Sequence, residues 1–474
     1  MASNDDIAFA GALEIRRLVQ EKKISPVEIT RIFLDRISRL DSSLNSYLTV
    51  TEEHALRSAK TAEHAVMRGD TLGPLHGVPV SIKDSESTKG VRTTSGSVIY
   101  KDRIPDWDSL PVERILGAGA IMLGKTNCPE FAMIGDTTNL LGDACRNPWN
   151  TAFSSGGSSG GGAAAVAAGL CSISQGSDGG GSIRGPASFC GVYGIKPTIG
   201  RVPRHPGPGN PPTINHFSQH GPLSRTVRDA AVLLQVLSGW DPRDPNALRD
   251  LPSDYLAATD QDIKGLKFGW SPDYGGFPVN SEIKNIAEQA AHTFEDIGCT
   301  VGEYDIRLDT PSDTFWTLTC ASIYEGFGEL YEKHKDIMMP YTRRKIEDGS
   351  MVTGADYVRA LGQMGVIKSK FQDKFEEFDL LINPTTGVAA FPAGEPTTEI
   401  EGQEVDEFEG YNPFNFNVNM IGYPAASVPC GFTNNGLPVG LQIIGRFGDE
   451  TRVIAASSAF ESANPWARHR PIIS

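Results

Sequence analysis

The sequence predicts an α/β fold with a largely parallel or mixed β-sheet. Short β-branched segments alternate with helical patterns, which favours a sheet flanked by helices. A segment of almost pure Gly and Ala at residues 160–170 suits a helix packed tightly on that sheet. The chain of 474 residues can bury an ample core, and neither an internal repeat nor a long linker divides it. We therefore expect one domain over residues 1–474.

Residues 1–70 are expected to form an N-terminal helical segment, with a helical pattern from residue 8 onward. Ser25, Pro26 and Glu28 mark a helix start: an N-cap serine, proline at the first helical position, and a glutamate that closes a capping box. Apolar residues then recur at helical intervals as far as Ile37. These helices are expected to pack around the sheet.

The next segment, residues 77–200, is expected to supply the core of the sheet. Residues 78–82 are a short β-branched run typical of a strand, residues 109–116 predict a helix, and residues 120–123 predict a second strand. Two glycine and serine clusters follow. The alternation continues the α/β pattern.

After residue 200 the pattern becomes irregular before it recovers. Residues 201–225 are rich in Pro, Gly and His, so we expect no regular element there and place the segment at the mouth of a site. A helix over 223–237, a strand over 266–270, a helix over 281–297 and a strand over 301–306 are predicted next.

Residues 307–376 are expected to be helical and to cover a substrate pocket, with the clearest helical pattern over 313–375. Most of the aromatic residues in this segment should be core, and one or two should line the pocket. They are Phe315, Trp316, Tyr324, Phe327 and Tyr331.

The last part of the chain predicts further strands. A buried strand is expected at residues 379–383 and an acidic, exposed loop at 402–410. Residues 426–429 and 439–444 flank Asn434-Asn435-Gly436, a turn signal that predicts a β-hairpin.

Composition excludes several classes of protein. A formal net charge of −15 disfavours binding to nucleic acid or to an anionic membrane surface. The first residues lack a secretory signal, and no apolar run approaches the ~20 residues that span a bilayer, so we expect a cytoplasmic protein. The seven cysteines form no C-x-x-C pair and the nine histidines show no ligand spacing. We expect no metal and no cofactor.

Two serines in the glycine clusters are the strongest candidates for chemistry. Ser158 and Ser182 lie 24 residues apart, one in each cluster. Glycine at this density lets the backbone approach a ligand and adopt positive φ. The second cluster opens a helix, so the N–H groups of residues 179–182 should lie at its positive end, where an anion is stabilised.

These motifs closely resemble the amidase signature family. The hallmark G-G-S-S-G-G begins at Gly156, the second cluster G-S-D-G-G-G-S-I-R-G-P-A follows from Gly176, and G-V-P-V-S-I-K-D covers residues 77–84. The likeness extends to G-K-T-N-C-P-E-F-A at residues 124–132, N-P-W-N at 147–150 and a C-terminal P-A-A-S-V-P-C-G. It implies the family's twisted mixed sheet of many strands with helices on both faces. Stand-alone bacterial amidases, aryl acylamidases and urethanases are the similar members.

The resemblance also implies residue roles. Ser182 would be the nucleophile of an acyl-enzyme, Ser158, on a cis peptide bond after Gly157, would relay the proton, and Lys83 would be the ultimate base. The remaining expected site residues comprise an oxyanion hole and three supporting groups. The backbone N–H groups of Gly179, Gly180, Gly181 and Ser182 would form the oxyanion hole, and Ser159, Asp178 and Arg184 would support it. A purely structural ion pair is the alternative for Asp178 and Arg184.

Two positions depart from the family pattern. Gly179 stands where Thr or Ile is usual, which retains the N–H donor but widens the space beside Ser182. Ser155 stands where proline commonly precedes the first glycine pair. Neither change removes an expected catalytic atom.

Three other motifs compete with this interpretation. Residues 156–160 satisfy G-x-S-x-G, but residues 150–155 are a poor strand for a nucleophile elbow. Ser281 and Lys284 satisfy S-x-x-K, although Ser281 is better explained as a helix N-cap. A cysteine amidase built from Lys125, Cys128 and Glu130 is disfavoured because the three crowd one loop.

Three functions compete at this point. The first is a hydrolase that cleaves the C–N bond of amides, and also carbamates or esters, acting on a small molecule without a partner protein; a homodimer stays open. The second is the glutaminase subunit of a tRNA-dependent amidotransferase, and the third is an inactive scaffold. We expect a neutral, partly apolar amide or carbamate to be preferred over glutamine, whose carboxylate Arg184 could receive but whose ammonium lacks an evident acidic partner.

Overall fold

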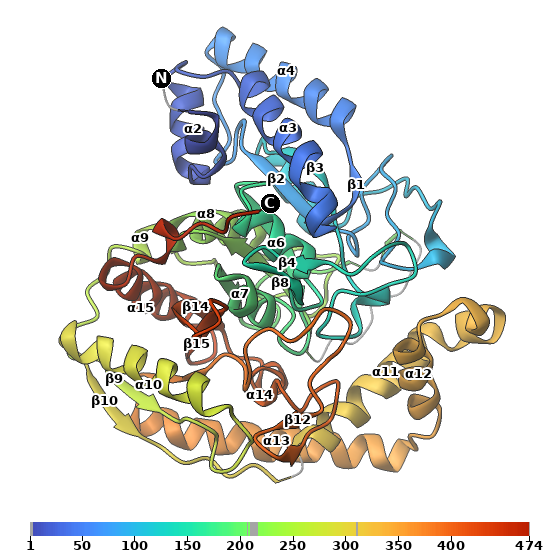
Figure 1. Ribbon diagram of the computed structural model, residues 1–474, viewed down its shortest axis with the longest axis vertical. Coiled ribbons are helices and arrows are strands. Elements are labelled where there is room, and N and C mark those ends of the chain that lie inside the picture. The colour runs from blue at the N-terminus through green and yellow to red at the C-terminus, as the bar shows by residue number, and fades with distance from the viewer. Residues whose placement is uncertain (1–2, 206, 209–216, 310, 474) are drawn as a thin grey trace.

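An eleven-stranded mixed β-sheet runs through the molecule, and helices flank it (Figure 1). The computed structural model describes residues 3–205, 207–208, 217–309 and 311–473. The strands follow the order β1-β3-β2-β6-β8-β7-β14-β15-β11-β9-β10. Parallel pairs join β2 to β3 and β6, and β9 to β10 and β11, while the other neighbours are antiparallel. The predicted α/β class is confirmed.

The N-terminal segment contains α1 (Asn4–Ala8), α2 (Ala12–Gln20), α3 (Pro26–Leu44) and α4 (Glu52–Arg68). The capping box at Ser25 is present, with the Ser25 side chain accepting from the Glu28 backbone N–H. The uniformly helical prediction was wrong at β1 (Tyr47–Val50), an edge strand antiparallel to β3. Only Tyr47 of its four residues is buried, so its sequence carries little alternation.

The middle of the chain builds the sheet as expected. Strands β2 (Pro79–Lys83) and β3 (Ile121–Thr126) flank α5 (Leu110–Gly117), and then α6 (Gly160–Ala167), β6 (Ile173–Asp178), α7 (Arg184–Cys190) and β7 (Tyr193–Lys196) follow. Glycine lets α6 approach the sheet closely. A Cβ at Gly162 would lie 2.6 Å from the Ser174 Oγ of β6.

Two strands contradict the predictions for this region. Strand β5 (Asn150–Ser154) forms beside β4 (Arg146–Asn147), but in a separate two-stranded ribbon outside the main sheet. Strand β8 (Gln219–Ser224) lies inside the segment expected to be irregular, and the following helix α8 (Val227–Leu237) therefore starts later than predicted. The β8 sequence contains Gly221 and Pro222, which disfavour a strand, and antiparallel pairing with β6 and β7 overrides this. Within the segment predicted to be irregular, residues 206 and 209–216 lie outside the described residues.

The C-terminal half completes the sheet. Strands β9 (Lys267–Trp270) and β11 (Leu380–Pro384) agree with the predictions, as does the hairpin of β14 (Ala425–Phe432) and β15 (Pro438–Ile444). Strand β10 (Thr300–Glu303) is present but ends three residues before its predicted end at residue 306. The remaining elements are α9 (Tyr255–Ala258), α10 (Ser281–Asp296), α14 (Pro413–Ile421), α15 (Glu450–Ala463), β12 (Glu399–Ile400) and β13 (Gln403–Glu404), with 3₁₀ turns at Val98–Tyr100, Glu130–Ala132, Lys335–Ile337 and Trp466–Arg468.

Two local predictions in this half were wrong. The N-cap of α10 is Asn280, whose side chain accepts from the N–H groups of Glu282 and Ile283, and Ser281 is the first helical residue. The expected exposed loop at 402–410 includes β13, and Glu409 within it is largely buried against Lys345. Residues 402–410 are polar and acidic, so their composition predicts exposure. The contact of Glu409 with Lys345 buries its side chain instead.

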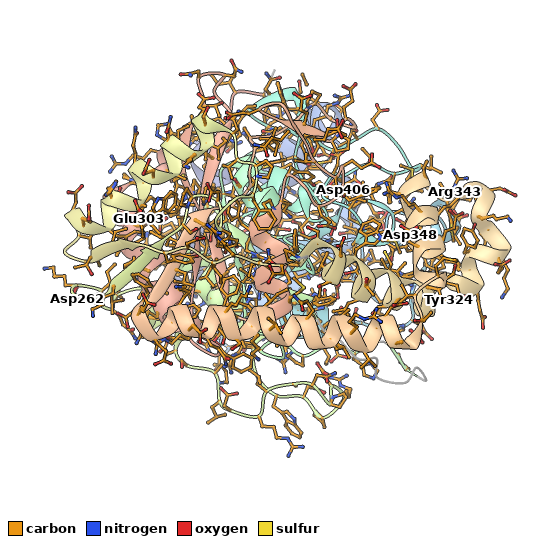
Figure 2. All side chains as sticks on the ribbon, turned by 90° about the horizontal axis from the view of Figure 1, so that it is seen from below. Asp262, Glu303, Tyr324, Arg343, Asp348 and Asp406 are labelled. Atoms are coloured by element: carbon orange, nitrogen blue, oxygen red, sulfur yellow. The ribbon has the colours of Figure 1, made fainter. Side chains whose placement is uncertain are left out.

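The predicted helical segment consists of α11 (Pro311–His334), α12 (Pro340–Ser350) and α13 (Gly354–Glu377). Helices α11 and α12 pack side by side (Figure 1). Figure 2 shows Tyr324, Arg343 and Asp348 of this pair at one end of the molecule, with Asp262 and Glu303 at the opposite end. Among the described residues, no helix is long and apolar enough to cross a bilayer.

Candidate active site

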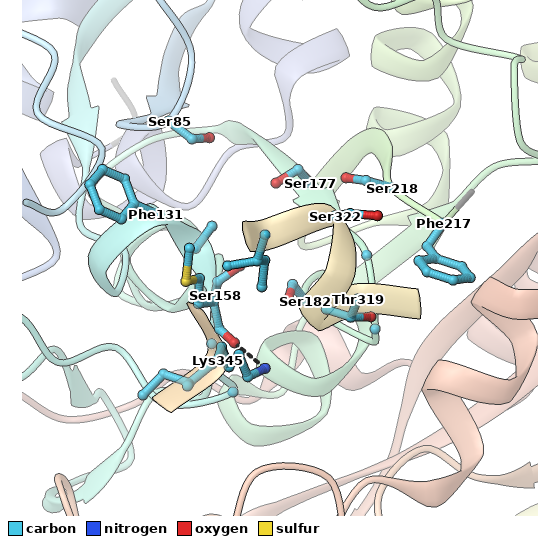
Figure 3. A pocket seen from close by; sticks show the side chains of 18 of the residues that line it. Ser85, Phe131, Ser158, Ser177, Ser182, Phe217, Ser218, Thr319, Ser322 and Lys345 are labelled. Carbon is cyan, nitrogen blue, oxygen red and sulfur yellow. Dashed lines mark hydrogen bonds between the residues drawn. The ribbon is translucent and has the colours of Figure 1, made fainter. Parts of the chain in front are cut away.

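A cavity of about 420 Å³ lies where the loop between β6 and α7 meets the start of α6 and the side of α11. Its lining includes Ser158, Ser182, Gly179 and Gly180, so the two serine clusters meet at one surface. Figure 3 shows Ser158 and Ser182 both at this cavity. Residues 24 apart in sequence thus share one site.

Lys83 reaches this site from the last position of β2, and its side chain is completely buried. The Nζ atom donates to Ser158 Oγ at 2.7 Å, to Ser177 Oγ at 3.0 Å and to Ser159 Oγ at 3.1 Å. Burial lowers the pKa of Lys83 to about 8, although nearby acidic groups oppose the shift. A useful fraction of the amine is therefore neutral near neutral pH.

The first serine cluster is held by close backbone packing. The Gly157–Ser158 peptide bond is cis, and a Cβ at Gly157 would lie 2.7 Å from the backbone N of Asp136. Ser159 Oγ donates to the Ser177 carbonyl at 3.1 Å and accepts from the Ser177 N–H at 3.2 Å. These contacts position the serines beneath Lys83.

The second cluster places Ser182 and several N–H groups at the cavity. The Ser182 carbonyl accepts from the Ser159 N–H at 3.1 Å, which joins the two clusters. The N–H groups of Gly179, Gly180 and Ser182 have no hydrogen-bond partner among the described residues. The Gly181 N–H differs, because it donates to Asp178 Oδ1 at 2.8 Å. Of the four groups expected to form an oxyanion hole, Gly181 is thus engaged elsewhere.

Asp178 and Arg184 form a completely buried ion pair below the loop, with Nη2 and Oδ1 2.9 Å apart. Burial alone would raise the pKa of Asp178, but the Arg184 guanidinium holds it well below its usual range. The same carboxylate accepts from the Ile183 N–H and from Asn419 Nδ2. This network holds the loop in shape.

Arg184 also donates to Gln442 Oε1 at 2.6 Å and to the Asn415 carbonyl at 3.1 Å. It is buried and does not line the cavity. The suggestion that Arg184 could receive a substrate carboxylate is therefore wrong, since its donors are engaged inside the protein.

Helix α11 supplies one wall of the cavity. Phe315 lies against the loop, because a Cβ at Gly180 would come within 2.8 Å of its ring. Phe327 packs against Phe131 with ring centroids 4.5 Å apart and the rings tilted by 34°, and both line the cavity. Trp316 and Tyr331 do not line it and instead donate to Asp348 and Glu347. The wall is thus partly aromatic.

Charged and polar groups line the remaining walls. Lys345 donates to the Met133 carbonyl at 2.8 Å and lies 3.6 Å from Glu409 (Figure 3 shows Lys345). Burial raises the pKa of Glu409 to about 7. His220 is buried, and desolvation lowers its pKa to about 4, so its imidazole is neutral.

The alternative motifs do not form sites. Cys128 is buried, does not line the cavity, and burial raises its pKa to about 12. Lys125 donates to Thr88 Oγ1 at 2.8 Å and to the Glu86 carbonyl. Lys284 lies 3.5 Å from Asp273, away from the cavity. Within the described part of the chain, no cluster of His, Cys, Asp and Glu could hold a metal ion.

Several site residues escaped the sequence analysis. Ser177, a third serine on Lys83, lies inside the G-S-D motif and could have been found there. His220 and Arg204 come from the segment judged irregular, and Asn412 comes from the start of α14. The buried asparagines of N-P-F-N-F-N-V-N at residues 412–419 were an available signal, because buried amides need hydrogen-bond partners.

Comparisons with known proteins match nearly the whole chain. A family model described as Amidase matches residues 28–454. A glutamyl-tRNA(Gln) amidotransferase subunit of Thermosynechococcus vestitus is 38% identical over 97% of this chain and 98% of its own length. An acylamidase of Rhodococcus erythropolis is 34% identical over 99% of this chain and 98% of its own length. The crystal structure of a bacterial aryl acylamidase superposes with a TM-score of 0.91 at 33% identity, covering 97% of each chain.

Proposed function

This chain belongs to the amidase signature family, and from that premise we propose that it is a stand-alone hydrolase that cleaves amide C–N bonds through an acyl-enzyme on Ser182. The observation that carries the proposal is the 2.7 Å contact between Lys83 Nζ and Ser158 Oγ at the cavity that Ser182 lines. A buried lysine next to a serine chain provides a base for a hydroxyl nucleophile.

In the proposed first half-reaction, neutral Lys83 accepts the Ser158 proton, and Ser158 accepts the Ser182 proton. The Ser182 oxygen then forms a bond to the carbonyl carbon of the substrate. The resulting oxyanion would accept hydrogen bonds from the N–H groups of Gly179, Gly180 and Ser182, which have no partner among the described residues. One oxyanion-hole donor is typically worth about 3 kcal/mol in the transition state.

Collapse of the intermediate breaks the C–N bond. Ser158 donates its proton to the leaving nitrogen and recovers a proton from the Lys83 ammonium, so the amine leaves neutral. A water molecule then attacks the acyl carbon, with its proton passing to Ser158 and Lys83. The carboxylic acid is released, and Ser182 regains its proton.

The pH dependence follows from the requirement for a neutral lysine. We expect kcat/KM to rise with pH and to level off above a pKa near 8, because the protonated amine cannot accept the Ser158 proton. A pH–rate profile on a neutral anilide, whose own charge does not change, measures this directly. A profile that is flat from pH 6 to pH 9 would contradict the role of Lys83.

For the substrate, we propose an amide or carbamate with an apolar part beside the reacting bond. Phe315, Phe327 and Phe131 offer an aromatic wall to that part. The two carboxylates that line the cavity, Glu86 and Glu409, each have a partner: Glu86 accepts from Ser109 Oγ at 2.9 Å, and Glu409 lies 3.6 Å from Lys345. An α-ammonium would have to compete for them.

The amidotransferase function stays the second candidate, because the Thermosynechococcus relative is 38% identical to this chain. The high superposition on an aryl acylamidase favours the stand-alone enzyme. The amide nitrogen of Asn412, at the cavity, donates to the Gly180 carbonyl at 2.8 Å. Asn412 is thus a neutral amide at the cavity. To bind the α-ammonium of glutamine, this position would need a carboxylate.

Substrate preference separates the two candidates. We expect the purified chain alone to hydrolyse an aryl amide or aryl carbamate with kcat/KM at least about tenfold above that for glutamine, since the α-ammonium of glutamine must be desolvated. Steady-state rates on the three substrates are the measurement. Best activity on glutamine, or activity only with an added partner protein, would establish the amidotransferase function instead.

A further inference from the structure

A second cavity of about 400 Å³ adjoins the active-site cavity. The two share a boundary formed by Ser85, Glu86, Arg204, His220 and Phe327, which line both. The second cavity is more polar, and it continues past this boundary toward Trp107 and Arg103. A substrate longer than the first cavity could therefore extend into it.

The carboxylates in this second cavity already accept hydrogen bonds from the protein. Glu86 Oε2 accepts from Ser109 Oγ at 2.9 Å. Asp244 accepts from the Arg204 backbone N–H at 2.8 Å and from the Asn246 backbone N–H at 2.9 Å. These acids are positioned by the protein's own donors.

The Arg204 guanidinium, unlike these carboxylates, has few hydrogen-bond partners among the described residues. It is half-buried, and its one hydrogen bond to a described residue is a long contact of 3.5 Å from Nη1 to the Ser218 carbonyl. No carboxylate of the described residues lies within ion-pair distance, and residues 205–218 contain no Asp or Glu. A guanidinium carries five N–H donors in a planar fork that matches a carboxylate. Most of this fork has no acceptor from the described part of the protein.

Arg103 adds positive charge to the same cavity. Its Nε donates to the Thr93 carbonyl at 2.9 Å, and within the described ranges it has no ion pair with a carboxylate. The imidazole of His220 is neutral and adds no charge. The two arginines balance Glu86 and Asp244 in charge, but the acids already accept from the protein, whereas most guanidinium N–H groups of Arg204 have no acceptor among the described residues. The cavity therefore favours a group rich in acceptors.

We propose that the second cavity is a subsite for a carboxylate at the end of the substrate remote from the scissile bond, with Arg204 as the residue that binds it. This inference rests on the proposed amide hydrolysis and names its substrate class: an amide whose uncharged, partly apolar portion lies in the first cavity and whose far end is acidic. It replaces the expectation of a wholly neutral substrate with that of an amide whose far end carries a negative charge. Arg204, and not Arg184, is the arginine available to a ligand.

Two anilides of matched length test the subsite by binding. The 4-nitroanilide of valeric acid ends in a methyl group, and the mono-4-nitroanilide of glutaric acid ends in a carboxylate. Calorimetry on the full chain carrying Ser182→Ala measures both without turnover. We expect the glutaric compound to bind about 10- to 100-fold more tightly, the range typical of a hydrogen-bonded charge pair.

Variants at Arg204 then assign the effect. Adding Arg204→Gln should reduce the ratio of the two affinities to about 1, and Arg204→Lys, which keeps the charge without the fork, should retain part of it. Arg307→Gln is the matched control, because its side chain is 82% exposed and outside both cavities. It should leave the ratio unaltered. Thermal melting of each variant checks folding.

Three results would overturn the proposal: equal or tighter binding of the valeric compound, a ratio unaffected by Arg204→Gln, or equal binding of a terminal carboxamide analogue. Turnover by the unaltered chain separates this inference from the proposed function. Hydrolysis of both anilides without a glutaric preference would remove the subsite and leave the hydrolase. Selective binding of the glutaric compound without hydrolysis of either anilide would support the subsite and contradict the proposed hydrolase function.

Discussion

Replacing Ser182 with alanine should reduce kcat by about 10⁴- to 10⁶-fold, the range seen when a catalytic serine is removed from a hydrolase. Ser182 lines the cavity beside the N–H groups of Gly179 and Gly180, which have no partner among the described residues, so the proposed acyl bond forms on its hydroxyl. Steady-state turnover of an aryl amide measures the loss, and a serine-directed reagent followed by peptide mass mapping should place the adduct on Ser182.

Cys128→Ala is the matched control for the nucleophile. Cys128 is buried, and burial raises its pKa to about 12, so its thiol should be neither a thiolate nor accessible to substrate. We expect this variant to retain kcat within a few fold. Modification of Cys128 with Ser182 untouched, or residual activity of Ser182→Ala above about one per cent, would refute the serine mechanism.

Replacing Lys83 should have the second largest effect, a loss of about 10³- to 10⁴-fold in kcat/KM, because general-base catalysis at this site has no other amine in contact with Ser158 among the described residues. Lys83→Ala and Lys83→Met should lose activity alike. Methionine fills most of the volume that alanine leaves empty, so a shared loss reports proton transfer rather than packing.

The folding of the Lys83 variants should change much less. Strand β2 is held by its pairing with β3 and β6, and those backbone contacts do not involve the Lys83 side chain. Thermal melting should therefore show cooperative unfolding of both variants. Two results would remove the lysine from the proposed mechanism: near-wild-type turnover in Lys83→Met, or a rate in the unaltered chain that does not rise toward pH 8.

Elements whose stabilising interactions are local in sequence could be predicted, and elements that depend on distant segments could not. The helix start at Ser25 and the turn at Asn434-Asn435-Gly436 were found because their signals lie within four residues. Strand β8 was missed because its own residues, with Gly221 and Pro222, disfavour a strand and only β6 and β7 stabilise it. The edge strand β1 was missed because it has almost no buried face.

The same distinction applies to the site. Ser158 and Ser182 could be identified as candidates because glycine-rich loops carry their geometry in local composition, whereas Lys83 was proposed only from the family resemblance. Their convergence depends on the parallel pairing of β2 with β6, which brings Lys83 within 2.7 Å of a serine 75 residues away. Local composition does not encode that distance.

By itself the sequence determined the α/β class and the two candidate serines, because helix caps, turns and glycine clusters are short-range features. The candidate lysine came from the family resemblance. The tertiary structure alone decided which arginine a ligand can reach. Arg184 is sealed against Gln442, 258 residues away, whereas Arg204 opens on two cavities. Burial is a property of surfaces brought together by folding, so two arginines that look alike in sequence differ completely in the donors they leave free.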